Sequence, residues 1–257
     1  MRTQNFSQIL FDALQYSGND RYNISRETFG QFRDFCNSRI REAWENQLWA
    51  DVCRVAEFTA VVDASGVTYF IPDAECGEVL GVYTLNPLVS SRAVGMNYQL
   101  YDTGTELRIV LETTTIATGW YYYRTKVPSL TGELFDPVTV YYAGSQVYFD
   151  SGSSTGTYIP VSGKPHSANF YTCLETTSAG QSPSTAPTKW KIEKIPYIFS
   201  QFMAWGACAN WFASETLLQE ALAIDSKARL LLEDEMDKQV NQQNQIPKLK
   251  FTNPYSR

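Results

Sequence analysis

The spacing of apolar residues divides the chain into helical ends and a β-rich middle. Apolar side chains recur every three or four positions over residues 5–17 and 25–55, which predicts helices. From residue 58 to about 192 the period is close to two and turn residues separate the runs, which predicts short strands. The helical period returns over 196–245. The pattern therefore predicts an α+β protein whose helical unit is split in sequence around the β-region.

The two ends of the helical unit differ in their apolar character. Residues 1–57 form its N-terminal part, and Ser25 is a suitable N-cap for the second helix. We expect one long C-terminal helix over 196–245, bent or broken around 213–215. Its first half, 198–212, is apolar on nearly all sides, which is typical of a buried helix. Its second half is amphipathic, with an exposed acidic side.

Two small antiparallel β-modules are expected between the helical parts, over residues 58–130 and 131–195. In the first, the turn at 64–66 predicts a hairpin. In the second, strands are expected at 138–142, 146–149, 157–160 and 170–174, and 190–192 ends the module. Loops rich in Ser, Gly and Thr lie at 150–156 and 178–188, and such surface loops often carry recognition.

Residues 246–257 cannot continue the last helix, because they contain Pro247 and Pro254. Leu249, Phe251 and Tyr255 give this basic segment apolar anchors, which suits an extended arm laid in a groove or along a sheet edge. The alternative is a frayed chain end.

Composition narrows the range of functions. Of the 257 residues, 44% are hydrophobic and 14% aromatic, which is typical of a folded protein with β-structure and a partner surface. The net charge of −6 gives no basic footprint for nucleic acid. Five scattered cysteines predict free thiols in a reducing compartment. No apolar run is long enough to predict a transmembrane span.

Catalytic and metal-binding patterns are missing from the sequence. The single histidine, His166, lies in a polar loop without a nucleophile elbow. Neither a P-loop nor a GxGxxG fingerprint is present, and the cysteines lack metal-ligand spacing. We therefore expect no enzyme activity, no cofactor and no metal site.

Aromatic residues of the second β-module allow two interpretations. Tyr142, Tyr148, Tyr171 and Trp190 are candidates for a platform that stacks on glycan or contacts a protein partner. The alternative is that they build the core of a module too small to rely on aliphatic side chains.

Part of this module resembles the chitin- and cellulose-binding modules of carbohydrate-binding families five and twelve. The residues that carry the resemblance are 143–148, 169–173, Pro183 and 190–191, with Ser145 where those modules usually have Asp. The resemblance implies a small β-fold, and sugar binding does not follow from a fold alone.

The flanking stretches resemble head-to-tail connector (adaptor) proteins of tailed bacteriophages. They are FRDFCNSRIREAWENQLW at 32–49, GEVLGVYTLNP at 77–87, and IPYIFSQFMAWGACANWFASE with the Gln-rich helix that follows. The resemblance implies a non-enzymatic virion protein of the neck, assembled in the host cytoplasm. Its helical unit would form a dodecameric ring on the portal protein and would contact other neck and tail proteins.

Further expectations follow for this chain. Residues 246–257, anchored by Pro247, Leu249, Phe251, Pro254 and Tyr255, would dock on the portal. An acidic stretch with Glu233, Asp234, Glu235 and Asp237 would line the channel and let viral DNA pass, or would form an ordinary solvated helix face. The alternative function is a carbohydrate-binding virion protein that contacts glycan through residues 131–195. Membrane partners are not expected.

Overall fold

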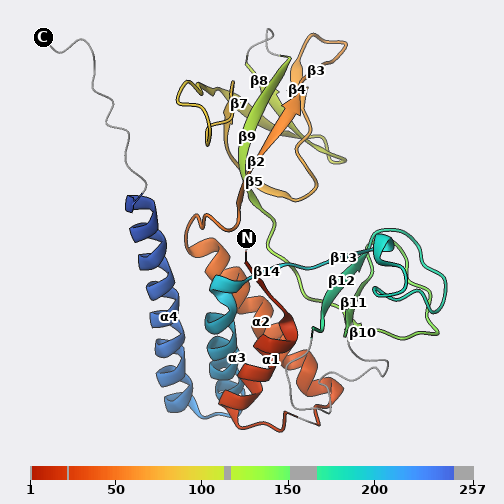
Figure 1. Cartoon of the computed structure of the whole chain (residues 1–257), viewed down its shortest axis with the longest axis vertical. Coiled ribbons are helices and arrows are strands. Elements are labelled where there is room, and N and C mark those ends of the chain that lie inside the picture. The colour runs from red at the N-terminus through yellow and green to blue at the C-terminus, as the bar shows by residue number, and fades with distance from the viewer. Residues whose placement is uncertain (1, 22, 113–116, 151–166, 246–257) are drawn as a thin grey trace, which may run out of the picture. The chain divides into compact units, whose positions relative to one another are not determined.

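The structure is a computed structural model that describes residues 2–21, 23–112, 117–150 and 167–245, the last six of these by their backbone alone. It contains helices and predominantly antiparallel sheets, which confirms the predicted α+β class (Figure 1). The chain divides into two compact units, which are described separately. Unit 1 comprises residues 1–46 and 128–257, and unit 2 comprises residues 47–127.

The helices of unit 1 are α1 (Phe6–Ser17), α2 (Arg26–Asn46), α3 (Ser200–Ser214) and α4 (Leu218–Gln245). The predicted start of α2 is confirmed, because the Ser25 hydroxyl accepts a hydrogen bond from the Thr28 amide at 3.0 Å. The predicted extension of this helix to residue 55 is wrong. It ends at Asn46, and strand β2 (Cys53–Thr59) of unit 2 follows.

Helix α3 forms the centre of unit 1 and packs against α1, α2 and α4 (Figure 1). Phe202, Met203, Ala207 and Cys208 are almost completely buried, as its all-round apolar sequence predicts. Facing them are the buried stripes of α1, with Ile9, Leu10 and Leu14, and of α2, with Phe32, Cys36 and Ile40.

The expected single helix over 196–245 is two helices. Strand β14 (Ile195–Pro196) pairs with β1 (Thr3–Gln4), and the 3-10 helix η2 (Tyr197–Phe199) leads into α3. After Ser214 the chain reverses in a Schellman motif, in which the Leu217 amide donates to the Phe212 carbonyl at 2.9 Å. Thr216 adopts the left-handed conformation (φ 64°) that glycine usually supplies there. The break expected near 213–215 is thus confirmed.

The second β-module forms a sheet in the order β10-β11-β12-β13, built from β10 (Glu133–Leu134), β11 (Gln146–Phe149), β12 (Asn169–Cys173) and β13 (Trp190–Ile192). It is not wholly antiparallel, because β10 pairs with β11 in parallel. The strand expected at 138–142 is absent, and the one expected at 157–160 lies outside the described residues. A short 3-10 helix, η1 (Pro187–Lys189), precedes β13.

This sheet shares its core with the helices. Phe170 and Tyr148 lie 4.9 and 6.0 Å from the ring of Phe6, and Phe29 lies 4.9 Å from Tyr148. All four rings are fully buried. The module therefore packs one side of its sheet against α1 and α2. On the other side it has a smaller cluster of its own around Val147, Cys173 and Trp190.

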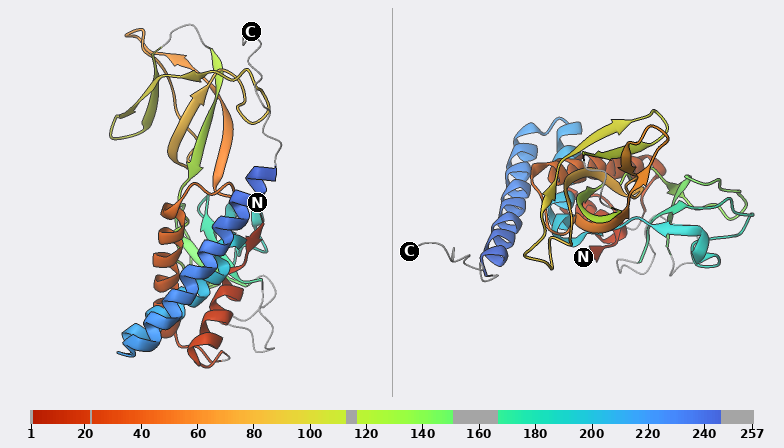
Figure 2. Two further views of the ribbon diagram at one scale, coloured as in Figure 1. Left: turned by 90° about the vertical axis from the view of Figure 1, so that its left-hand side faces the viewer. Right: turned by 90° about the horizontal axis from the view of Figure 1, so that it is seen from above.

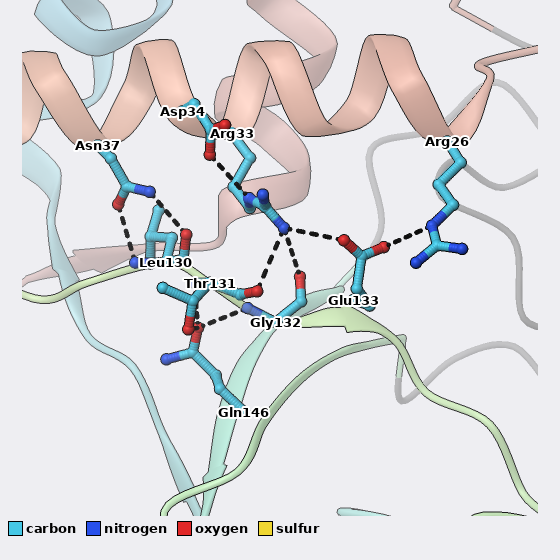
Figure 3. Close-up of polar contacts among 9 residues, drawn as sticks. All are labelled: Arg26, Arg33, Asp34, Asn37, Leu130, Thr131, Gly132, Glu133 and Gln146. Atoms are coloured by element: carbon cyan, nitrogen blue, oxygen red, sulfur yellow. Dashed lines mark hydrogen bonds and ion pairs between the residues drawn. The ribbon is translucent and has the colours of Figure 1, made fainter.

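The segment that re-enters unit 1 is fastened to α2 by polar side chains (Figure 3). The Asn37 amide donates to the Leu130 carbonyl at 2.6 Å and accepts from the Leu130 amide at 2.8 Å, as a paired strand would. The Arg33 guanidinium reaches the Glu133 carboxylate at 3.2 Å. Gln146 on β11 accepts from the Thr131 amide at 2.6 Å. Residues 129–133 are thereby held between α2 and the sheet.

Unit 2 is built from two four-stranded antiparallel sheets with the orders β2-β9-β5-β6 and β3-β4-β8-β7. Its remaining strands are β3 (Val61–Val62), β4 (Thr68–Phe70), β5 (Cys76–Tyr83), β6 (Gly95–Met96), β7 (Tyr98–Asp102), β8 (Leu107–Leu111) and β9 (Thr118–Thr125). The predicted hairpin around 64–66 is confirmed by the pairing of β3 with β4. Phe58, Phe70, Ile109 and Tyr121 lie in the buried core of this unit.

Candidate functional site

Helix α4 leaves most of its surface uncovered. Over its described side chains only Ala221, Ala228 and Leu232 are buried. They are seven and four positions apart, so they form one stripe along the helix. Leu218, Leu222 and Leu230 are each more than 60% exposed. A helix of 28 residues with so narrow a buried stripe presents an apolar surface suited to a partner.

A buried arginine attaches α4 to the other helices. Arg39 of α2 is 7% exposed, and its guanidinium lies 2.6 Å from the Asp225 carboxylate of α4. It also donates to Asn210 of α3 at 2.7 Å and pairs with Glu42 at 3.2 Å. Glycine at 206 makes room for it, since a Cβ there would lie 2.6 Å from Arg39 Cδ.

Arg229 of α4 closes the network from the outer side. It lies 2.8 Å from Asp225 and 2.9 Å from Glu42, so that two arginines and two carboxylates alternate. Burial opposes the ionisation of Asp225, but Arg229 and Arg39 outweigh burial and lower the pKa of this carboxyl. The network therefore adds paired charges to the apolar contact that α4 makes through Ala221, Ala228 and Leu232.

An aromatic stack supports the middle of α4. The rings of Tyr16 on α1 and Trp205 on α3 are stacked at 3.8 Å, and the Lys227 ammonium lies 3.5 Å from the Trp205 ring centre. Three helices thus meet at one surface position.

The acidic residues proposed to line a channel lie on α4. Glu233, Asp234 and Asp237 are exposed, whereas Glu235 is partly covered and pairs with Lys238 at 2.6 Å. Together with Leu218, Leu222 and Leu230, the three exposed carboxylates define what we call the α4 face. Its acidic end is suited to repelling DNA phosphates, and the whole face is suited to a partner with apolar and basic groups.

A second acidic surface lies along α2. Asp34, Asn37, Ser38, Arg41, Glu42 and Glu45 line a shallow polar hollow along one side of this helix. Its lining is a single helical stripe with three carboxylates and one arginine, and the Glu42 carboxylate joins it to the network around Arg39.

The proposed aromatic platform does not form. Tyr148 faces the helices and is fully buried, and burial raises its pKa. Trp190 is also buried, beside Tyr141 at 5.5 Å, and its indole N–H donates to the Gln181 carbonyl at 3.2 Å. Tyr171 is partly buried, and only Tyr142, at 68%, is well exposed. The interpretation of these rings as core is correct for Tyr148 and Trp190.

An exposed apolar ridge takes the place of that platform. Val138, Val140, Tyr142 and Leu174 are exposed, the first three at alternate positions of the segment expected to be a strand. Asp136 accepts from the Val138 amide at 3.1 Å, and the Tyr141 hydroxyl accepts from the Asp136 amide at 2.8 Å. These bonds hold the segment in place without the strand pairing that its alternating apolar pattern predicts.

The residues of the expected docking arm lie outside the described residues, as does His166, for which no role is expected. The arm residues are Pro247, Leu249, Phe251, Pro254 and Tyr255. The five cysteines are described, and all are buried free thiols. Burial raises the pKa of Cys36 and of Cys208 to about 12, so neither thiol is reactive near neutral pH.

Within the part of the chain that the structure describes, no group of His, Cys, Asp and Glu has the arrangement of a metal site. None of the helices described combines the length and the apolar character needed to cross a bilayer. No protein-family model matches this chain, and no curated protein matches its sequence.

Proposed function

We propose that this protein is a structural, non-enzymatic component of a phage neck. It would be a head-to-tail adaptor that forms a ring below the portal, through which DNA passes. The observation that carries the proposal is the α4 face, where a long helix with a narrow buried stripe exposes leucines and carboxylates. The sequence resemblance to connector proteins supports the same role.

The exposed surfaces of unit 1 suit assembly into a ring. A ring of identical subunits needs two different contact surfaces on each copy. The α4 face and the ridge at 138–142, which both expose apolar side chains, would supply two such surfaces. In this role the carboxylates that remain exposed on the assembled ring keep DNA from adhering to it.

Native mass spectrometry of the full chain mixed with the portal ring of its virus tests the proposal. We expect about one copy per portal subunit, and we expect that removing residues 246–257 abolishes this association. A chain that does not bind the portal ring at any ratio would contradict the adaptor role.

The alternative function is glycan binding through residues 131–195. Of the four rings proposed as its platform, only Tyr142 is well exposed, and Tyr171 is partly buried. Two rings of unequal exposure provide little stacking surface, and we therefore place the adaptor role first. Screening polysaccharides for binding to the wild type and to Tyr142→Ala tests this alternative. If sugar binds through this ridge, the variant should lose the binding that the wild type shows.

A further inference from the structure

The turn that joins α3 to α4 carries no residue that stops a helix. Residues 213–217 read Ala-Ser-Glu-Thr-Leu, without glycine or proline. The chain nevertheless reverses there, and Thr216 adopts the left-handed conformation at φ 64°. Glycine adopts that conformation without penalty, whereas a β-branched side chain disfavours it. In a helix that continued through the turn, Thr216 would have the ordinary right-handed conformation and this strain would disappear.

The N-cap position of α4 is occupied by a leucine. The helix begins at Leu218, so Leu217 stands where a side-chain oxygen normally accepts from the first amides. The Ala221 amide donates to the Leu217 carbonyl at 3.0 Å, and the three amides before it precede the first intrahelical bond. In a continuous helix, the amides of residues 218–220 would donate to the carbonyls of residues 214–216.

The contacts of α4 with the other helices therefore hold the bend against the preference of the turn. Figure 1 and Figure 2 show α4 running back beside these helices. Its buried stripe consists of Ala221, Ala228 and Leu232, and its strongest polar contact is the ion pair of Asp225 with Arg39 at 2.6 Å. On its own side, α4 thus gives up little apolar area if this contact opens.

We propose that the joint between α3 and α4 is a conformational switch. In the bent form, which the structure shows, the charge network around Arg39 docks α4 on the other helices. When the network opens, α3 and α4 join into one continuous helix over residues 200–245. Straightening removes the strain at Thr216, completes the hydrogen bonds of residues 218–220 and uncovers the buried stripe of α4. The switch is a property of the free chain and does not depend on the adaptor role.

A distance measurement by pulsed electron paramagnetic resonance tests the switch. Gln201→Cys on α3 and Glu233→Cys on α4 place spin labels at exposed positions on either side of Thr216, while the five native cysteines are buried. Packed helix axes lie about 10 Å apart, so we expect a label distance below roughly 30 Å in the bent form. At 1.5 Å per residue, the continuous helix separates the two positions by about 48 Å.

Charge reversal in the network should shift the population. Asp225→Lys places a third cation beside Arg39 and Arg229, and we expect it to raise the ratio of long to short distances at least tenfold. Adding Thr216→Gly should lower that ratio about three- to tenfold, because glycine relieves the bent form and weakens the continuous helix. Asp237→Lys makes the same charge change at an exposed position of α4 and is the matched control.

A milder variant covers the case in which Asp225→Lys does not fold, which circular dichroism reports. The Arg229 side chain is 56% exposed, and Arg229→Glu opposes Glu42 and Asp225 from the outer side of the network. We expect this variant to shift the distances in the same direction by a smaller factor. Amide hydrogen exchange at residues 218–220 should become slower in both variants, since these amides gain acceptors only in the continuous helix.

Two outcomes overturn the switch. One is a short distance that persists in both folded variants, because the bend then does not depend on the network. The other is a broad distance distribution with faster exchange at residues 218–220, which shows that α4 detaches without joining α3. Neither outcome affects the adaptor role, which native mass spectrometry with the portal ring tests separately.

Discussion

At the scale of single residues, the attachment of α4 depends on the absence of a side chain at position 206. Gly206 lies on α3 directly below Arg39, and a Cβ there would lie 2.6–2.8 Å from the Cδ, Nε and Cγ atoms of that arginine. The Arg39 side chain cannot easily move aside, because Asn210, Glu42 and Asp225 bind its guanidinium. Sequence alone shows only a glycine in an apolar helix, where it costs helix stability.

We therefore expect Gly206→Ala to destabilise the protein by about 1–3 kcal/mol, although alanine is the better helix former. Gly30→Ala is the matched control, because the corresponding Cβ on α2 meets nothing within 4 Å. It should stabilise by about 0.5–1 kcal/mol. Urea unfolding of both variants measures the difference. Equal effects at the two positions would show that Arg39 moves aside.

The aromatic residues show what composition can and cannot indicate. Tyr148 and Tyr142 are six positions apart in one β-module, yet the first is fully buried and the second is 68% exposed. The difference depends on Phe6 and Phe29, which lie far away in sequence and cover Tyr148.

At the scale of elements, α4 combines a narrow apolar contact with a charged network. Its docking should therefore depend on pH. The pKa of Asp225 is lowered in the folded protein, so its contribution to stability is present above its unfolded pKa of about 4. That contribution is lost as pH falls through the lowered value.

We expect Asp225→Asn to cost about 1–3 kcal/mol at pH 7, because it leaves Arg39 with less compensation for its buried charge. The difference from wild type should shrink as pH falls below about 4. Amide hydrogen exchange along α4, with denaturant unfolding at several pH values, measures both effects. Asp237→Asn, on the exposed side of the same helix, should change neither. A pH-independent cost would mean that Asp225 acts through packing alone.

The break between α3 and α4 is also an element-scale feature. Both α1 and α3 end in Schellman motifs, and Gly18 (φ 73°) occupies the left-handed position in the first. Thr216 occupies it in the second, although β-branched residues disfavour that conformation. The position of the break is therefore decided by the packing of the two helices and not by a local turn signal.

At the scale of the whole molecule, the chain leaves unit 1 after α2 and returns to it at residue 128. Unit 2 has its own buried core around Phe58, Phe70, Ile109 and Tyr121. The β10–β13 sheet, in contrast, shares Tyr148 and Phe170 with α1 and α2. The two β-regions therefore differ in autonomy, although their sequences predict two similar modules.

We expect an isolated fragment of residues 47–127 to fold, and a fragment of residues 128–196 to remain unfolded. The reason is that the first fragment contains its whole core, around Phe58, Phe70 and Tyr121. In the second, Tyr148 and Phe170 need cover from α1 and α2, and the cluster that remains around Val147, Cys173 and Trp190 is small. Circular dichroism and the dispersion of amide NMR signals of the two fragments provide the measurement. A folded 128–196 fragment would show that the contacts with Phe6 and Phe29 are dispensable.

Local sequence patterns predict several of the local elements correctly. Apolar period, caps and turns were sufficient for α1, for the start of α2 and for the hairpin around 64–66, because each depends on neighbours in the chain. Tertiary structure alone decided the β1–β14 pairing, the parallel β10–β11 pair and the burial of Tyr148 and Trp190. It also decided that Arg39, one of several arginines on α2, is the buried one that holds α4. These features depend on contacts between segments far apart in the sequence, on the direction in which two strands pair, or on which face of a strand is covered. Periodicity carries no information about any of the three.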